Sequence, residues 1–153
     1  MKIAFKKVMR EVETKLDKLL AAKPFQLAKV PLYLPAKGIY LLCKGKRALY
    51  VGRSNGIGSR LRGHVADSHY SATFAFLLAR EATGCLKATY KTKGSRTSLL
   101  KNRKFKSCFD SARNEIRKMK IRVVEETDPT KQALLEIYAA YVTKAKYNTF
   151  DNH

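Results

Sequence analysis

The spacing of apolar residues predicts a helix at the start of the chain. Between residues 3 and 22, apolar side chains recur at spacings of three, four and five, with charged residues between them. This period is typical of an amphipathic α-helix that buries one face. Pro24 ends the pattern, and the prolines between residues 24 and 35 indicate an extended connector instead of a second helix.

The apolar pattern then changes to two short runs typical of a β-hairpin. Residues 38–43 and 48–52 are apolar and aromatic, and the residues between them are Lys, Gly, Lys and Arg. A turn centred on Gly45 would place Tyr40 directly opposite Tyr50, with both phenols on one face of the sheet. Opposed tyrosines commonly serve packing alone, so this pair by itself does not indicate catalysis.

The rest of the chain mixes helices with one more strand. A run of β-branched residues predicts a strand over residues 120–125. Asp128 followed by Pro129 is a typical start for the last helix, whose apolar residues form one stripe. Residues 84–106 contain two glycines and many cations, and they fit no single element. Helices are also expected over residues 59–65, from residue 71 onward and over residues 107–119.

These elements predict an α+β fold of the α/β sandwich type, with a small three-stranded antiparallel central sheet flanked by helices and an extra N-terminal helix. With 153 residues, 45% of them hydrophobic, the chain is long enough for one compact domain. We expect residues 1–36, the first helix and the proline-rich connector, to pack on a main domain formed by residues 37–153. The basic segment of that domain spans residues 84–122.

The charge of the chain points to a polyanionic partner. The sequence has 32 Lys and Arg residues against 12 Asp and Glu, a formal net charge of +20. Self-repulsion of this size opposes compaction, so we expect a polyanionic partner, most often nucleic acid, with an anionic membrane surface as the rival. Between residues 87 and 122, thirteen cationic residues stand against two acidic ones, which indicates either a solvated face or a footprint for phosphates. The candidate nucleic-acid contacts are Lys93, Arg96, Lys101, Arg103 and Lys104.

Neither a membrane-spanning segment nor a secretory leader is expected. The longest useful uncharged run, Ser68 to Ala79, has 12 residues, whereas a spanning helix needs about 20. Charged residues interrupt the N-terminal segment where a leader would need an apolar core. Cys43, Cys85 and Cys108 show no CxxC spacing and fit reduced, packed thiols. We therefore expect a cytoplasmic protein.

Four polar residues lie where they could take part in chemistry. Arg60 and His64 are four positions apart on one predicted helix, so they share a face suited to a phosphate, unless they are an ordinary surface arginine and a capping histidine. Glu136 lies at the edge of the apolar stripe of the last helix, either solvated or binding a divalent cation. No second convergent carboxylate is evident, which argues against a two-metal site. Asn148 follows this helix and could cap its C-terminus.

The order and spacing of these residues resemble the GIY-YIG nuclease family. The resemblance covers residues 38–148, with valine in place of the second isoleucine of the name motif. Arginine stands where many members have lysine, and histidine stands where many have tyrosine. Residues 66–120 match no subgroup of the family. The residues that carry the resemblance are Gly38-Ile39-Tyr40, Tyr50-Val51-Gly52, Arg53, Arg60, His64, Glu136 and Asn148.

The resemblance implies an endonuclease that hydrolyses phosphodiester bonds in DNA. It implies one Mg²⁺ or Mn²⁺ ion bound by Glu136, which would steady the leaving oxygen. Tyr40 would act as the general base and accept a proton from the attacking water. Because an ordinary phenol has a pKa of about 10, making Tyr40 a half-ionised base at neutral pH requires about 4 kcal/mol of stabilisation.

The other residues of the resemblance would act around the phosphate. Tyr50, Arg53 and Arg60 would position the phosphate and offset its developing charge. His64 would share with Arg60 the contact to the phosphate or the leaving group. Asn148 would support the metal and tyrosine side of the site.

Two other functions stay open from the sequence. A non-catalytic basic nucleic-acid-binding module would bind DNA without cutting it, and a structural RNA-binding protein would prefer RNA and ignore the metal. The motifs do not choose between branched, double-stranded and single-stranded DNA. A homodimer would permit double-strand cleavage, whereas a monomer would more naturally nick.

Overall fold

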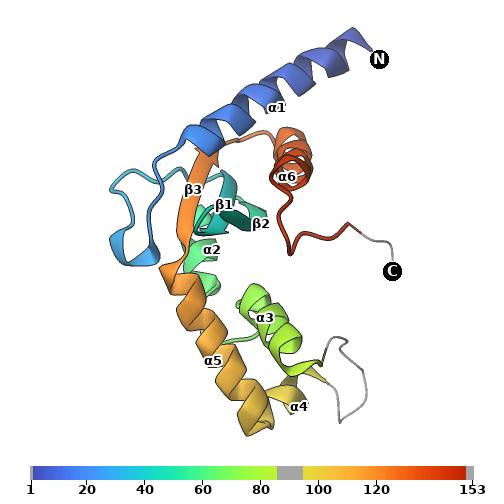
Figure 1. The fold of residues 1–153 in the computed structure, drawn as a ribbon. Coiled ribbons are helices and arrows are strands. Elements are labelled where there is room, and N and C mark those ends of the chain that lie inside the picture. Colours follow the sequence, from blue (N-terminus) through green and yellow to red (C-terminus); the bar gives the residue numbers. More distant parts are fainter. Residues whose placement is uncertain (1, 86–94, 151–153) are drawn as a thin grey trace. The chain divides into compact units, whose positions relative to one another are not determined.

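The computed structural model describes residues 2–85 and 95–150 and divides into two compact units. The sheet unit contains residues 1–58 and 119–153, and the helical unit contains residues 59–118 (Figure 1). The sequence predicted one compact domain, and it does not reveal this division. The division follows from packing, because the elements of each unit bury apolar side chains mainly against one another.

Three antiparallel strands form the centre of the sheet unit. β1 (Gly38–Lys44) lies between β2 (Arg47–Ser54) and β3 (Lys120–Glu125). The predicted α+β class with a small three-stranded antiparallel sheet is therefore confirmed for the described residues. Phe25 exchanges two backbone hydrogen bonds with Ile121, at 2.9 and 2.7 Å, so the proline-rich connector pairs with the outer edge of β3.

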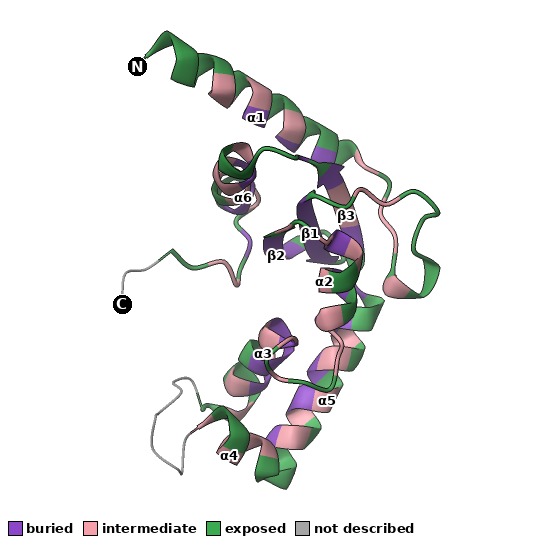
Figure 2. Ribbon diagram, turned by 180° about the vertical axis from the view of Figure 1, so that it is seen from behind, coloured by how far each residue is buried: buried purple, intermediate pink, exposed green. Residues whose placement is uncertain are grey.

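Two helices cover one face of this sheet. α1 (Ile3–Ala21) and α6 (Pro129–Thr143) both pack against it, as predicted for the amphipathic N-terminal helix. Asp128 caps α6 by accepting a hydrogen bond from the backbone N–H of Lys131, which confirms the expected helix start. Figure 2 shows the first turns of α1 as exposed. The shared core includes Val12, Leu16, Leu19, Ile39, Leu41, Val51, Leu135 and Ala139.

The hairpin register differs from the predicted one. Tyr40 pairs with Gly52, and Tyr50 pairs with Leu42. The pairing differs from the predicted one by two residues, because the turn joins the partners Lys44 and Arg47 instead of centring on Gly45, and because the register shifts by one more residue between Leu42 and Cys43. The two tyrosines are therefore diagonal neighbours and not directly opposed. They still share one face of the sheet, since side chains alternate with a period of two along each strand.

Two glycines of the hairpin allow close approaches that a side chain would prevent. A Cβ at Gly38 would lie 2.0 Å from the carbonyl oxygen of Val124 in β3. A Cβ at Gly52 would lie 2.2 Å from Cζ and Oη of Tyr40. The strand pairing and the position of the Tyr40 ring therefore both require glycine at these positions.

The helical unit is built mainly from two helices. α3 (Thr73–Thr83) packs against α5 (Arg103–Lys118), and both helices carry buried residues (Figure 2). Phenylalanine side chains form part of this contact. The ring centroids of Phe76 and Phe105 are 5.0 Å apart, and Phe109 lies 6.3 Å from Phe76. The unit also contains α4 (Arg96–Lys101) and most of α2 (Ile57–Gly63).

Helix boundaries in the helical unit were predicted less well. α2 begins two residues before the expected residue 59, and α3 begins at Thr73 without a side-chain cap from Ser71. The segment 84–106, which fits no single element by pattern, contains α4 and the first residues of α5. α5 starts at Arg103 because the Asn102 side chain accepts a hydrogen bond from the backbone N–H of Phe105.

The structure gives the burial of the three cysteines and the length and polarity of the helices. Cys43 is buried as expected, but Cys85 is exposed and Cys108 is half-buried, so the prediction of packed thiols is wrong for Cys85. Every helix among the described residues is too short or too polar to cross a membrane.

Candidate active site

The tyrosine pair lies on the sheet face away from α1 and α6. The ring centroids of Tyr40 and Tyr50 are 6.2 Å apart, with the rings inclined by 41°. Tyr40 is 1% exposed, and Tyr50 is half-buried. The Tyr40 ring crosses the backbone at Gly52, so its hydroxyl lies beside the strand that carries the second half of the motif.

Glu136 and Arg53 form an ion pair between α6 and β2. Arg53 Nε lies 3.0 Å from Glu136 Oε2, and the glutamate side chain is 22% exposed against 47% for the arginine. Burial raises the pKa of Glu136, and the charge and hydrogen bond of Arg53 offset this only in part. Desolvation therefore outweighs the ion pair, and this carboxylate is held with few competing water contacts.

Asn148 holds the chain that follows α6 against β2. Its amide accepts a hydrogen bond from the backbone N–H of Val51 at 2.7 Å and donates one to the carbonyl of Val51 at 2.8 Å. Tyr147 N–H adds a bond of 2.9 Å to the carbonyl of Leu49. The alternative role of helix cap is wrong, because the C-cap of α6 is Lys144 in the left-handed conformation.

Gln132 is a buried polar residue that sequence patterns did not single out. Its side-chain amide donates to the carbonyl of Glu126 at 2.6 Å and to Asn55 Oδ1 at 3.2 Å. These bonds tie the first turn of α6 to the ends of β2 and β3, one turn before Glu136. A signal was available, since Gln132 occupies a core-facing position of α6, three residues before the buried Leu135.

Strand alternation places the phenols and the ion pair on opposite faces of β2. Leu41 and Val51 belong to the core shared with α6, so the tyrosines face the other way. Arg53 comes two residues after Val51 and therefore points to the α6 side, where it meets Glu136. β2 is an edge strand, and the C-terminal segment bonds to it from Ala48 to Val51. A ligand that contacts both groups would therefore have to pass around the edge of β2 near Gly52.

Arg60 and His64 belong to the helical unit and are engaged there. A backbone hydrogen bond of 3.2 Å from His64 N–H to the Arg60 carbonyl continues the helical path, so the two residues do share a face. Arg60 donates to the carbonyl of Ser71 at 2.8 Å and to Thr73 Oγ1 at 3.3 Å, which fixes the start of α3. The predicted phosphate contact of Arg60 would use its other N–H groups.

His64 is a buried, neutral imidazole. It is 0% exposed, and its ring meets Phe74 edge-on with centroids 6.2 Å apart. Burial, together with the charge of Arg60, lowers the pKa of His64 to about 3. His64 therefore brings no positive charge to a phosphate at neutral pH, and a role at the site would be through hydrogen bonding or packing.

The buried His64 predicts loss of stability in mild acid. Its pKa is about 3 in the folded chain and about 6.5 in an unfolded chain. Below pH 6.5 the unfolded state takes up a proton that the folded state does not, so stability falls as the pH falls. Between pH 6.5 and pH 5 the free energy of unfolding should drop by about 2 kcal/mol more than in His64→Phe.

Urea unfolding of both proteins at the two pH values measures this difference. The partly exposed His69 supplies a comparison, because burial and the charge of Arg96 lower its pKa as well, but less than that of His64. His69→Gln should therefore remove less of the acid sensitivity than His64→Phe. Equal pH dependence in the wild type and His64→Phe would show that His64 titrates normally in the folded protein.

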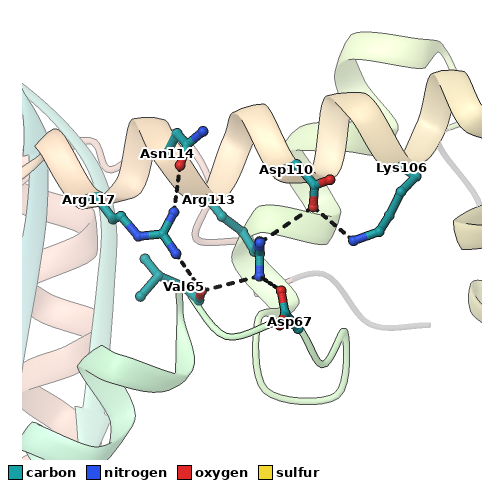
Figure 3. Close-up of polar contacts among 7 residues, drawn as sticks. All are labelled: Val65, Asp67, Lys106, Asp110, Arg113, Asn114 and Arg117. Carbon is teal, nitrogen blue, oxygen red and sulfur yellow. Dashed lines mark hydrogen bonds and ion pairs between the residues drawn. The ribbon is translucent and has the colours of Figure 1, made fainter.

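The basic segment divides into engaged and exposed cations. On α5, Arg113 pairs with Asp67 and Asp110, and Arg117 donates to the Val65 carbonyl at 3.2 Å (Figure 3). Lys106 pairs with Asp110 at 2.9 Å. These contacts hold the loop after α2 on α5, so the cations of the second half of α5 serve mainly the fold of the helical unit.

Most of the predicted nucleic-acid contacts belong to the exposed group. Arg96, Lys101, Arg103 and Lys104 are exposed, and none of the four forms an ion pair with a described carboxylate. Lys93 lies outside the described residues. The exposed cations lie in α4 and at the start of α5. The total charge of the segment did not indicate where in the segment they would lie.

Known proteins offer no match to this arrangement. Comparison of the chain with family models, curated proteins and solved structures found none that matches.

A metal ion implied by the resemblance would find one carboxylate at this site. Among residues 2–85 and 95–150, no group of three or more His, Cys, Asp or Glu side chains could hold an ion. Glu136 Oε2 binds Arg53, which leaves Oε1 as the candidate ligand atom. This donor set fits Mg²⁺ in the form it commonly takes, with one carboxylate and with water and phosphate oxygens as the other ligands.

Proposed function

We propose that this chain is a GIY-YIG-like endonuclease that hydrolyses phosphodiester bonds in DNA at the edge of β2. The observation that carries the proposal is the ion pair between the half-buried Glu136 of α6 and Arg53 of β2. The same strand carries Tyr50 and Gly52, and Gly52 is in contact with Tyr40. A desolvated carboxylate, a guanidinium and two phenols around one strand are groups that phosphodiester hydrolysis uses. Asn148 supports the proposal because it fixes the β2 backbone between Tyr50 and Gly52.

In the proposed reaction, water attacks the phosphorus atom and the ionised Tyr40 phenol accepts its proton. The bond from phosphorus to the leaving sugar oxygen breaks, and that oxygen takes up a proton from solvent. Tyr50 and Arg53 orient the phosphate, and the guanidinium offsets the charge that develops on its oxygens. Glu136 would hold Mg²⁺, which supplies a positive charge next to the phosphate when it is bound. The functions predicted for Arg60 and His64 are part of the proposal, with His64 acting as a neutral imidazole.

The net charge of +20 supports DNA as the substrate. The exposed cations of α4 and α5 can neutralise backbone phosphates without reading sequence, because phosphate contacts carry affinity and base contacts carry specificity. The rival function, a basic module that binds nucleic acid without cutting it, rests on these same cations and on none of the residues of the sheet unit.

Tyr40→Phe is expected to reduce cleavage by a factor of about 100 or more, since general bases contribute about 10² to 10⁴ in rate. The wild-type rate should rise with pH above neutrality, because a larger fraction of the phenol is then ionised. The measurement is conversion of supercoiled plasmid to nicked or linear DNA, with and without Mg²⁺, at several pH values.

Tyr138→Phe provides the matched control, because this partly buried tyrosine packs against the core of the sheet unit. It should cleave like the wild type. Cleavage by Tyr40→Phe at the wild-type rate would contradict the general-base assignment, and binding of plasmid without any cleavage by the wild type would favour the rival function.

A further inference from the structure

The helical unit contains a cluster of two arginines and a histidine around one buried ring. The guanidinium carbon of Arg80 lies 5.0 Å from the centroid of Phe76, and that of Arg96 lies 5.5 Å from the same centroid. The ring of His69 is 6.0 Å from Phe76. Phe76 itself is 2% exposed, so it forms a fixed support for these groups.

This cluster has more hydrogen-bond donors than acceptors. Nε and Nη2 of Arg80 are buried and have no hydrogen-bond partner among the described residues, and neither arginine forms an ion pair with a described carboxylate. A buried donor without an acceptor destabilises the folded state, because it has lost its hydrogen bonds to water. Burial and the charge of Arg96 both lower the pKa of Arg80. The cluster therefore favours an entering oxyanion, which would supply acceptors and reduce the repulsion between the guanidinium groups.

An aromatic surface continues from this cluster. The ring of Tyr70 lies 4.1 Å from that of His69, inclined by 34°, and Tyr70 is 75% exposed. A large aromatic ring that is stacked on one side and open on the other offers a surface for a nucleobase, because every base has a π-face. Paired bases in a duplex are already stacked, so such a surface selects an unpaired strand.

We propose that Arg80 and Arg96 bind a backbone phosphate of an unpaired DNA strand and that Tyr70 stacks on one of its bases. The inference rests on the proposed function in taking DNA as the polymer. It adds a strand-binding site, formed by residues that the sequence did not single out apart from Arg96. The sequence feature that could have pointed to Arg80 is its position directly after the long uncharged run, Ser68 to Ala79.

The phosphate contact can be measured as a salt dependence. In EDTA, the logarithm of the affinity for a fluorescent single-stranded oligonucleotide should fall with the logarithm of salt concentration, with a slope that is smaller by about 0.7 for each lost phosphate contact. The double variant Arg80→Gln/Arg96→Gln should lose about one contact. The variant Arg80→Lys/Arg96→Lys should keep most of the slope, because it keeps both charges.

The matched control is Lys7→Gln/Lys18→Gln, which removes two charges from exposed positions of α1. It should change the slope less than the arginine double variant. An equal loss of slope in the two double variants would overturn the phosphate site, because only total charge would then matter.

The stacking contact has a separate readout. Tyr70→Leu should weaken single-strand binding by about 5-fold to 150-fold, the range that base stacking contributes, with little change in slope. Duplex binding should change less. Tyr33→Leu is the control, since Tyr33 is 93% exposed in the sheet unit. Equal weakening of single-strand and duplex binding by Tyr70→Leu, or no weakening, would overturn the stacking site.

Two further measurements keep the test independent of folding and of cleavage. Thermal unfolding identifies variants that fold poorly, and titration of the wild type with inorganic phosphate should shift the NMR signal of Arg80 Nε–H, whereas Arg96→Gln should reduce that shift. No shift at Arg80 would overturn the site directly. If the chain binds phosphate and single strands in this way but cleaves no DNA, the inference holds and the proposed function fails.

Discussion

Glu136→Gln is expected to lower Mg²⁺-dependent cleavage by a factor of about 100 or more while DNA binding stays intact. The amide keeps the size of the side chain but removes the carboxylate charge that would bind the ion, and a bound ion contributes several kcal/mol of charge stabilisation, where about 3 kcal/mol corresponds to about 100-fold in rate. Plasmid cleavage and oligonucleotide binding, measured on the same preparation, separate the two effects.

The same substitution should not destabilise the fold at neutral pH. Burial raises the pKa of Glu136, so the folded protein binds a proton there more readily than the unfolded chain. The stability that the folded protein gains from this protonated carboxyl is fully present below the ordinary carboxyl pKa. It is lost as the pH rises through the raised pKa of Glu136. At neutral pH the ionised side chain therefore carries a desolvation cost, which a neutral glutamine removes.

Glu13→Gln serves as the control, because it removes one negative charge from an exposed position of α1. It should cleave like the wild type. Two results would contradict the assignment of Glu136: full cleavage by Glu136→Gln, or cleavage by the wild type that is undiminished in EDTA.

Gly52→Ala is expected to destabilise the protein by about 1–3 kcal/mol, the usual cost of inserting a methyl group into a packed region. Its Cβ would lie 2.2 Å from the Tyr40 ring and 2.7 Å from Cε1 of that ring, so the ring must move. Cleavage should fall as well, because the Tyr40 hydroxyl would leave its position beside β2. Denaturant unfolding and the plasmid assay measure the two consequences.

Gly56→Ala is the matched control, since a Cβ at Gly56 would meet no atom within 4 Å and its backbone needs no positive φ. It should leave stability within about 0.5 kcal/mol of the wild type. The collision can be isolated in a double-mutant cycle, because Gly52→Ala should cost much less when Tyr40 is replaced with alanine. A cost for Gly52→Ala that is the same in both backgrounds would show that Tyr40 is not the residue it displaces.

Much of the fold could be predicted because its signals are local. The stripe of Val12, Leu16 and Leu19 marks the buried face of α1, and Asp128 with Pro129 marks the start of α6. The hairpin and β3 follow from short apolar runs between turn residues. Tyr40 and Tyr50 lie on one face as predicted, but only because the register shift between Leu42 and Cys43 offsets the displaced turn. Alternation counted from the Lys44–Arg47 pair alone would place them on opposite faces.

The sequence was enough to single out most residues of the candidate site, but not to predict how they are arranged. Glu136 and Arg53 were each singled out, but their ion pair joins residues that are far apart in the sequence. The burial of His64 and the bonds from Arg60 to Ser71 and Thr73 also depend on how α2 and α3 pack. Charge counting located the basic segment without separating Arg113 and Arg117, which bind within the helical unit, from the exposed arginines.

The sequence by itself therefore determined the elements of the sheet unit, the charge of the chain and the residue types available for chemistry. Only the tertiary structure decided the division into two units, the diagonal position of the tyrosines, the Arg53–Glu136 pair, the neutral state of His64 and the unsatisfied donors of Arg80. The physical reason is the range of the forces involved. Periodicity and capping act within a few residues, whereas desolvation and side-chain pairing depend on segments that meet only after the chain has folded.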